Sequence, residues 1–234
     1  MTSVSKFLAR TGVAIGAGAV LAAAPAAPAV AQVDGRLATV SVERALLGTS
    51  GLQTAFNQVS TTYQAQVESA QAKQDELQAL LQPFDTNRDS NIDQSETAAL
   101  QASPTFQQIQ TLQGEVAAIE EQVTAAQVYA VEQVLIQYQT ALSEVATQQQ
   151  VVMVVSPASL QYASEGADIT AAVSSALDTK VPTVAIVPPQ GWRPNPRSVQ
   201  VFQDINRLLL IQQARQQQAA QQGQQPATEP PTGR

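Results

Sequence analysis

The chain has 234 residues, with 19 acidic against 12 basic side chains and a formal net charge of −7 at pH 7. This acidic balance argues against a protein that follows nucleic-acid phosphates, because that function needs a basic face. The chain contains no cysteine and no histidine, so it has no disulfide framework and lacks the commonest general base and transition-metal ligand.

The first residues have the order of a secretory signal peptide. Lys6 and Arg10 form a short basic region, an uncharged run follows at 12–24, and the small-residue triplet AVA stands at 29–31. The uncharged run is shorter than the roughly 20 residues that a membrane span needs. The pattern predicts a cleaved signal peptide over 1–31 and an exported protein without stable membrane insertion.

Residues 32–50 are expected to hold the first strand of a small body. Leu37–Val42 alternates and is rich in β-branched side chains, which is typical of a strand. A helix is then predicted to begin at Ser50, because Ser50 and Gln53 have the spacing of a capping box. Apolar residues recur after it with early gaps of four, three and four, the spacing of a coiled-coil helix.

A second helical stretch, from 104 to 149, carries a stripe with the same gaps of four and three. Because the first helix is too long to fold back on itself, we expect residues 51–150 to form an antiparallel coiled-coil hairpin. The first stripe consists of Leu52, Phe56, Val59, Tyr63, Val67, Ala70, Leu77, Leu81 and Phe84, and the second of Leu112, Val116, Ile119, Val123, Ala126, Ala130, Val134, Tyr138, Leu142 and Val145.

The loop 85–96, at the turn of this hairpin, resembles the calcium loop of an EF-hand. Oxygen-bearing side chains occupy its first, third, fifth, ninth and twelfth positions, and the seventh can offer a backbone carbonyl. Ser90 stands at the sixth position, where a glycine is usual. The alternative is a polar turn, since Asn, Asp and Ser are common turn residues. The expected Ca²⁺ ligands are Asp85, Asn87, Asp89, Asn91, Asp93 and Glu96.

Residues 151–187 are expected to complete the body. Val151–Val155 is almost wholly apolar, like a buried strand. Asp168 is a good N-cap for a short helix that runs through Leu177, and Val184–Val187 is a candidate third strand.

Residues 188–234 are rich in Pro and Gln and are expected to be mostly tail. An amphipathic patch at 198–218 is compatible with a helix that docks on the body or on a partner. The fold expected for the whole chain is mainly α with a small β body, from which the hairpin projects. Because a sheet of two or three strands is marginal alone, the body is expected to form an oligomer.

This organisation resembles the periplasmic Skp (OmpH) chaperone family. The segments LATVSVERALLGTS and VVMVVSPASLQYASEGADITAAVSSAL occur in the family's order around the Gln-rich hairpin. The resemblance implies a periplasmic homotrimer, free or peripheral to the outer membrane, whose arms hold unfolded outer-membrane proteins without ATP or another required cofactor. The chain itself has no phosphate-binding G-x-x-x-x-G-K-[ST] motif.

The segment 51–150 has twelve acidic residues and only two basic ones, whereas arms in the family are often basic. Little attraction to anionic lipid is therefore expected. Enzymatic activity is not expected, because there is no G-x-S-x-G motif and the adjacent Glu120 and Glu121 do not face each other on a helix. The alternative function is a structural or scaffolding envelope protein with a calcium-binding coiled-coil tip.

Overall fold

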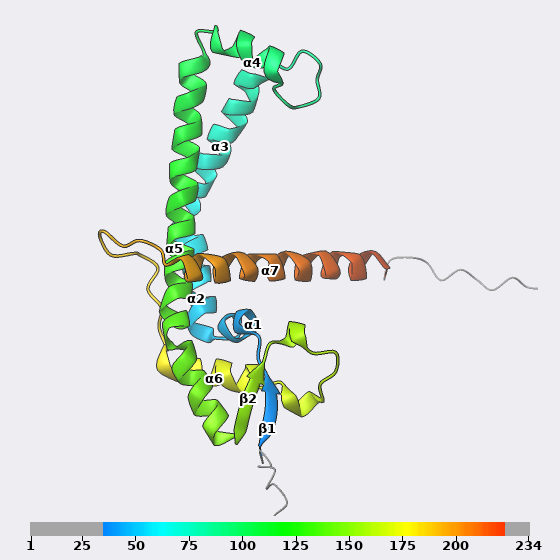
Figure 1. The fold of residues 1–234 in the computed structure, drawn as a ribbon. Coiled ribbons are helices and arrows are strands. Elements are labelled where there is room, and N and C mark those ends of the chain that lie inside the picture. Colours follow the sequence, from blue (N-terminus) through cyan, green and yellow to red (C-terminus); the bar gives the residue numbers. More distant parts are fainter. Residues whose placement is uncertain (1–34, 223–234) are drawn as a thin grey trace, which may run out of the picture. The chain divides into compact units, whose positions relative to one another are not determined.

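The computed structural model describes residues 35–222, so the predicted signal peptide and the end of the predicted tail lie outside the described residues. This part of the chain is mainly helical with a two-stranded sheet, which confirms the expected fold class (Figure 1). Its helices and strands are β1 (Arg36–Thr39), α1 (Val42–Leu47), α2 (Ser50–Thr62), α3 (Gln64–Leu81), α4 (Gln94–Gln101), α5 (Phe106–Gln148), β2 (Val151–Val155), η1 (Pro157–Ser159), η2 (Glu165–Ala167), α6 (Thr170–Lys180) and α7 (Pro196–Gln222).

Strands β1 and β2 pair in parallel, with Leu37 opposite Met153 and Thr39 opposite Val155. The first strand is shorter than the predicted 37–42, because Ser41 begins a new helix. Its hydroxyl accepts the N–H of Arg44 at 3.3 Å and caps α1, a helix that the alternating pattern did not predict.

The predicted hairpin contains α2 and α3 on its outward path, the short α4 at its tip and α5 on its return. Helix α2 ends at Thr62 and α3 begins at Gln64, with Tyr63 between them at φ −101° and ψ 11°. Helix α5 returns over 43 residues and packs against both α2 and α3 (Figure 1). The predicted capping box at the start of α2 is wrong, because the N-cap is Thr49 and the Gln53 side chain donates to the carbonyl of Leu47 at 2.8 Å.

After β2 the chain forms α6, which begins one residue later than predicted. Asp168 still accepts the N–H of Thr170 at 2.9 Å, although the N-cap position is Ile169. The predicted third strand at 184–187 is wrong, because this segment is irregular. Its Ala185 N–H and carbonyl bond to the side-chain amide of Gln133, so a side chain takes the place of a neighbouring strand.

Helix α7 is longer than the predicted 198–218, and its first half docks on the rest of the chain. Val201, Phe202 and Ile205 are buried in the main core, and α7 packs against α5 and α1. From Leu210 onward the described side chains of the helix are exposed.

The main core lies where α1, α2, α6 and α7 meet the second half of α5. A smaller cluster of Val59, Tyr63 and Ala126 lies at the break between α2 and α3. Because α5 is covered by several helices here, residues beside the predicted stripe, such as Val131 and Ala141, are fully buried as well. The base of the hairpin thus belongs to the core, whereas α3 meets the rest of the chain chiefly through α5.

Candidate functional site

The arm, which we define as α3, the tip residues 82–105 and the first half of α5, has little apolar packing. Helix α3 buries Ala70 and leaves Val67 half exposed. Leu112 and Val116 of α5 are buried, but Leu77 and Leu81 of α3 are only partly buried. The arm therefore presents long polar faces with scattered apolar side chains instead of a pocket.

Polar side chains join the two helices of the arm. Lys73 forms an ion pair with Glu115. Gln74 donates to Glu120 at 3.0 Å, and Gln108 donates to Glu76 at 3.0 Å. Such contacts between exposed side chains add little stability, about 1 kcal/mol or less each. The arm is thus held together by many weak contacts along its length.

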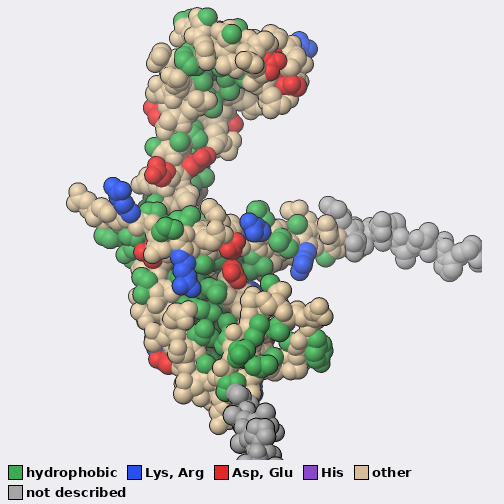
Figure 2. Space-filling view, viewed as in Figure 1, with side chains coloured by type: hydrophobic (Ala, Val, Ile, Leu, Met, Phe, Trp, Pro, Cys, Tyr) green, Lys and Arg blue, Asp and Glu red, His purple; other side chains and the backbone are tan. Residues whose placement is uncertain are grey.

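The charges of the described residues are unevenly distributed. Residues 51–150 contain Lys73 and Arg88 as their only basic side chains. Several basic residues instead follow α6, namely Arg193, Arg197, Arg207 and Arg215. On the face drawn in Figure 2, Lys and Arg side chains gather at the level of α7, and the arm beyond it shows mainly acidic and uncharged side chains.

In the tip loop that is predicted to bind calcium, the side-chain oxygens accept hydrogen bonds from backbone N–H groups of the loop itself. Both oxygens of Asp85 accept N–H groups, from Asp89 at 3.1 Å and Ser90 at 2.9 Å. The Asn87 side chain also accepts the N–H of Asp89, at 2.9 Å, and Asp89 accepts the N–H of Asn91 at 2.8 Å. These bonds orient oxygen atoms around the turn, and Ser90 has the positive φ of 66° that the sixth position of such a loop favours.

Glu96 is buried and joins the two ends of the loop. Its Oε1 accepts the N–H and hydroxyl of Thr86, both at 2.7 Å, and its Oε2 accepts the N–H of Asp93 at 3.1 Å. Asp93 in turn accepts the N–H of Glu96 at 2.9 Å, so the pair forms the capping box of α4. The hydrogen bond from the Thr86 hydroxyl, with those from the backbone, lowers the pKa of Glu96.

Within residues 35–222, no three Asp, Glu, His or Cys side chains gather closely enough to hold a metal ion. The structure brings Asp85, Asn87 and Asp89 into one turn, and Glu96 reaches the start of this turn through its hydrogen bonds with Thr86. The calcium ligand set stays a prediction.

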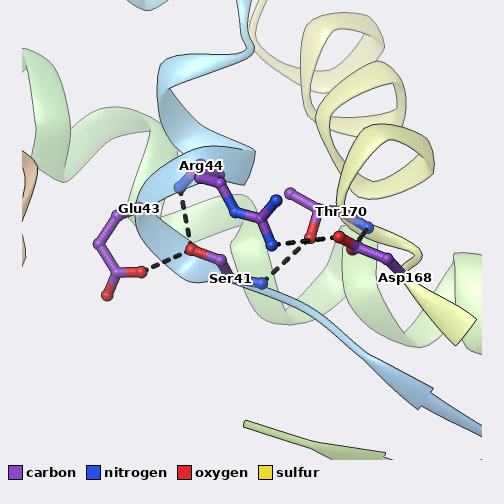
Figure 3. Close-up of polar contacts among 5 residues, drawn as sticks. All are labelled: Ser41, Glu43, Arg44, Asp168 and Thr170. Atoms are coloured by element: carbon purple, nitrogen blue, oxygen red, sulfur yellow. Dashed lines mark hydrogen bonds and ion pairs between the residues drawn. The ribbon is translucent and has the colours of Figure 1, made fainter. Parts of the chain in front are cut away.

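A polar network joins the start of α1 to the start of α6 (Figure 3). Ser41 N–H donates to the Thr170 hydroxyl at 3.1 Å, and the Arg44 guanidinium donates to Asp168 at 3.1 Å. Ser41 also donates its hydroxyl to Glu43 at 2.8 Å. Desolvation raises the pKa of Asp168, but the hydrogen bonds from Thr170 and the charge of Arg44 outweigh it and leave that pKa below its ordinary value. This network ties α1 to α6 and is structural.

The sheet carries large apolar side chains that the described chain leaves exposed. Leu37 is 61 % exposed, Met153 is 58 % exposed and Val152 is 50 % exposed. The expectation that Val152 lies in a buried strand is thus not met within one chain. A two-stranded sheet with such side chains is an incomplete layer.

Sequence reasoning missed a set of contacts on the base of α5. Tyr129 meets the ring of Trp192 edge to face at 5.3 Å, Glu132 accepts the N–H of Asn195 at 3.2 Å, and Gln133 bonds to Ala185. Glu132 and Gln133 stand three and four positions after Tyr129, so each is a neighbour of Tyr129 on the helix surface. In the sequence, the only indication of these contacts is that polar side chains stand next to the apolar stripe of α5.

Together these features define a helical-hairpin protein with a small parallel sheet, and none of its described helices is both long and apolar enough to cross a membrane. Residues 36–177 match the model of a family described as outer membrane protein (OmpH-like). The chain therefore belongs to the OmpH-like family of outer-membrane-protein chaperones. The family resemblance inferred from the sequence is confirmed.

A solved structure that resembles this chain is an OmpH-like outer-membrane chaperone candidate from Caulobacter crescentus CB15. The two are 21 % identical, and the match covers 66 % of this chain and 90 % of that chain with a TM-score of 0.41. No curated protein matches this chain.

Proposed function

We propose that this chain is an ATP-independent periplasmic holdase chaperone that binds unfolded outer-membrane proteins along its arms. The observation that carries the proposal is the arm itself, which belongs to an OmpH-like chain and offers long exposed faces with little core of its own. An unfolded client presents many short apolar and polar segments, and such a surface can meet them at many points.

Many weak contacts suit this purpose better than one tight site. The exposed faces of α3 and α5 are mostly Gln and Ala, interrupted by side chains such as Val67. Each contact contributes little, but contacts made together raise the overall affinity through a high effective concentration. The client can still leave stepwise, because no single contact holds it.

We propose that the body assembles into a homo-oligomer, a trimer as the family resemblance implies. The exposed side chains of Leu37, Val152 and Met153 support this proposal, since burying them between copies would complete the sheet layer. Several arms would then surround one client. This arrangement needs no enzymatic step and no nucleotide.

A structural or scaffolding role in the envelope is the alternative function. It is favoured by the second half of α7, which exposes Leu210 and Ile211 and lies beyond the family match. A scaffold would use this helix or the Pro- and Gln-rich end of the chain to bind a partner, and its arms would not hold unfolded proteins.

Light scattering separates the two functions. An outer-membrane β-barrel protein is diluted from urea into buffer with and without the mature chain, in the absence of ATP. A holdase suppresses the rise in scattering, with full effect near one oligomer per client. A scaffold leaves the rise unchanged, and that result would refute the proposed function.

A further inference from the structure

The segment 181–195, which we call the strap, connects α6 to α7 and lies beyond the residues that match the family model. It runs along the base of the hairpin and contacts both of its helices. Val184 is buried in the main core, and Trp192 and Ile186 pack against that core. A segment without helix or strand thus reaches the core through a few apolar side chains, although most of its residues are exposed.

On one side the strap is bonded to α5. Gln133 Nε2 donates to the carbonyl of Ala185 at 2.8 Å, and the Ala185 N–H donates back to Gln133 Oε1 at 3.0 Å. The adjacent Glu132 accepts the N–H of Asn195 at 3.2 Å and the indole N–H of Trp192 at 3.4 Å. Side chains of α5 thus bond to the backbone of the strap at Ala185 and at Asn195.

On the other side the strap lies against the start of α2. A Cβ atom added at Gly51 would lie 2.8 Å from the carbonyl oxygen of Val181 and 3.4 Å from a methyl group of Val184. The first distance is shorter than real Cβ contacts, so the strap can pass here because residue 51 has no side chain. The close approach fixes the strap to α2 independently of the hydrogen bonds to α5.

The strap reaches as far along the hairpin as the break between α2 and α3. Ile186 packs against the small cluster of Val59, Tyr63 and Ala126, which marks this break. Beyond Tyr63, α3 packs chiefly on α5 and buries Ala70. The packing of the hairpin thus changes at the residue where the strap makes its last contact.

Helix α7 anchors the far end of the strap. Asn195 accepts the N–H of Arg197 through its side chain at 2.9 Å, and Ser198, Val201, Phe202 and Ile205 are buried. Helix α7 crosses α5 in Figure 1, so the strap is held between two packed helices, α6 and α7. A strap fixed at both ends can resist movement of the helices that it contacts.

We propose that the strap is a brace that holds the base of the hairpin to the body and so places the pivot of the arm at Tyr63. Without the brace, the hairpin would pivot near Ser50, where α2 begins. The use of this device rests on the proposed client-holding function, since the pivot sets how far an arm can swing around a client. The pivot itself is a property of the free protein and can be measured without a client.

Distances between spin labels test the pivot, and the cysteine-free chain allows labels at introduced cysteines alone. One label is placed at Ala171 of α6, and the other at Gln58 of α2 or at Gln78 of α3, all of which are exposed. Labelled chains are diluted into an excess of unlabelled protein so that distances within one chain are measured. The Glu132→Ala/Gln133→Ala/Trp192→Ala triple variant removes the hydrogen bonds that hold the strap to α5, and Gln139→Ala removes an exposed Gln of the same helix as the control.

With the strap intact, the Gln58–Ala171 distances form a narrow distribution, because Gln58 lies before the pivot. Releasing the strap broadens this distribution. It also roughly doubles the width of the Gln78–Ala171 distribution. The reason is that the length of helix between the pivot and Gln78 grows from about 20 Å to about 40 Å at 1.5 Å per residue when the pivot moves from Tyr63 to Ser50. The Gln139→Ala control leaves both distributions unchanged.

Gly51→Ala provides a second route, because the added methyl group displaces the strap from α2 while Gln133 and Trp192 remain. Circular dichroism shows which variants keep their helices. An unchanged Gln58–Ala171 distribution in either folded variant would overturn the brace. If the distributions broaden as stated but the light-scattering assay shows no client protection, the brace stands and the proposed function fails.

Discussion

At the scale of single residues, Glu96 illustrates how one spacing can serve two purposes. Asp93 and Glu96 are three positions apart, which is the spacing of a capping box and also that of the ninth and twelfth positions of an EF-hand loop. The structure uses the pair to cap α4. The sequence alone could not decide between the two, because both need an Asp and a Glu at the same separation.

The capping pair should make the tip sensitive to acid. The pKa of Glu96 is lowered by the hydrogen bond from Thr86 and by backbone N–H groups, and that of Asp93 is lowered chiefly by the Ser95 hydroxyl. Both carboxylates therefore stabilise the folded tip above their ordinary pKa values of about 4, and this contribution is lost as the pH falls through the lower folded values. Carboxyl NMR signals should show Glu96 titrating below its ordinary value, together with loss of amide protection in α4. A Glu96 pKa at or above the ordinary value would contradict this view, and Glu96→Gln should remove the part of the pH dependence that comes from Glu96.

Calcium binding at the tip stays a prediction, and the geometry gives a reason why it should be weak. Glu96 would have to leave Thr86 in order to coordinate an ion next to Asp85. We expect a dissociation constant on the order of 10⁻⁴–10⁻³ M, as in extracellular modules. Calorimetry at millimolar Ca²⁺ measures it, and Asp85→Ala with Glu96→Gln should abolish the heat. No heat, or the same heat in the double variant, would show that the loop is only a turn.

At the scale of helices and strands, the periodicity of apolar residues predicted those helices whose burial depends on a stripe three and four residues apart. The stripes identified the hairpin and the buried positions of α5, such as Val134 and Tyr138, because a helix buries residues three and four apart. They missed α1 and wrongly made a strand of 184–187. In both cases the deciding partners are far away in the sequence: Thr170 bonds to Ser41, and Gln133 bonds to Ala185.

Helix α6 supplies the sharpest stability test of this core. Leu177 is fully buried, whereas Leu210 of α7 is 65 % exposed. Leu177→Ala should lower the free energy of unfolding by about 2–5 kcal/mol, because it removes buried apolar surface and leaves a cavity. Leu210→Ala should change it by no more than about 0.5 kcal/mol. Urea denaturation at equal protein concentration compares them, and equal losses would place α6 outside the core.

At the scale of the whole molecule, the described chain leaves apolar surface on its sheet. The sequence identified Val151–Val155 as a strand but could not show whether one chain or several would bury it, because strand patterning does not reveal the number of copies. Within one chain, β2 has partly buried side chains at Val154 and Val155 and exposed ones at Val152 and Met153. The exposed pair is where we expect a second copy to pack.

Two matched substitutions test this assembly. Val152 and Val67 are equally exposed in the single chain, at 50 %, but Val152 lies in the sheet and Val67 in the arm. Val152→Asp should weaken the oligomer by several kcal/mol, about 3–5, because it would leave an unpaired charge buried between copies. Val67→Asp should leave the solution mass unchanged. Sedimentation equilibrium decides between these outcomes, and an unchanged mass for Val152→Asp would remove the sheet from the interface.

The central claim is that this protein keeps unfolded outer-membrane proteins in solution by holding them. Sedimentation velocity of a fluorescently labelled, urea-unfolded β-barrel protein tests it most directly, because it follows the client itself. The claim predicts that, without ATP, the client sediments together with the mature chain as one discrete complex of one oligomer and one client. A client that sediments as aggregates at the same rate with and without the chain would contradict it.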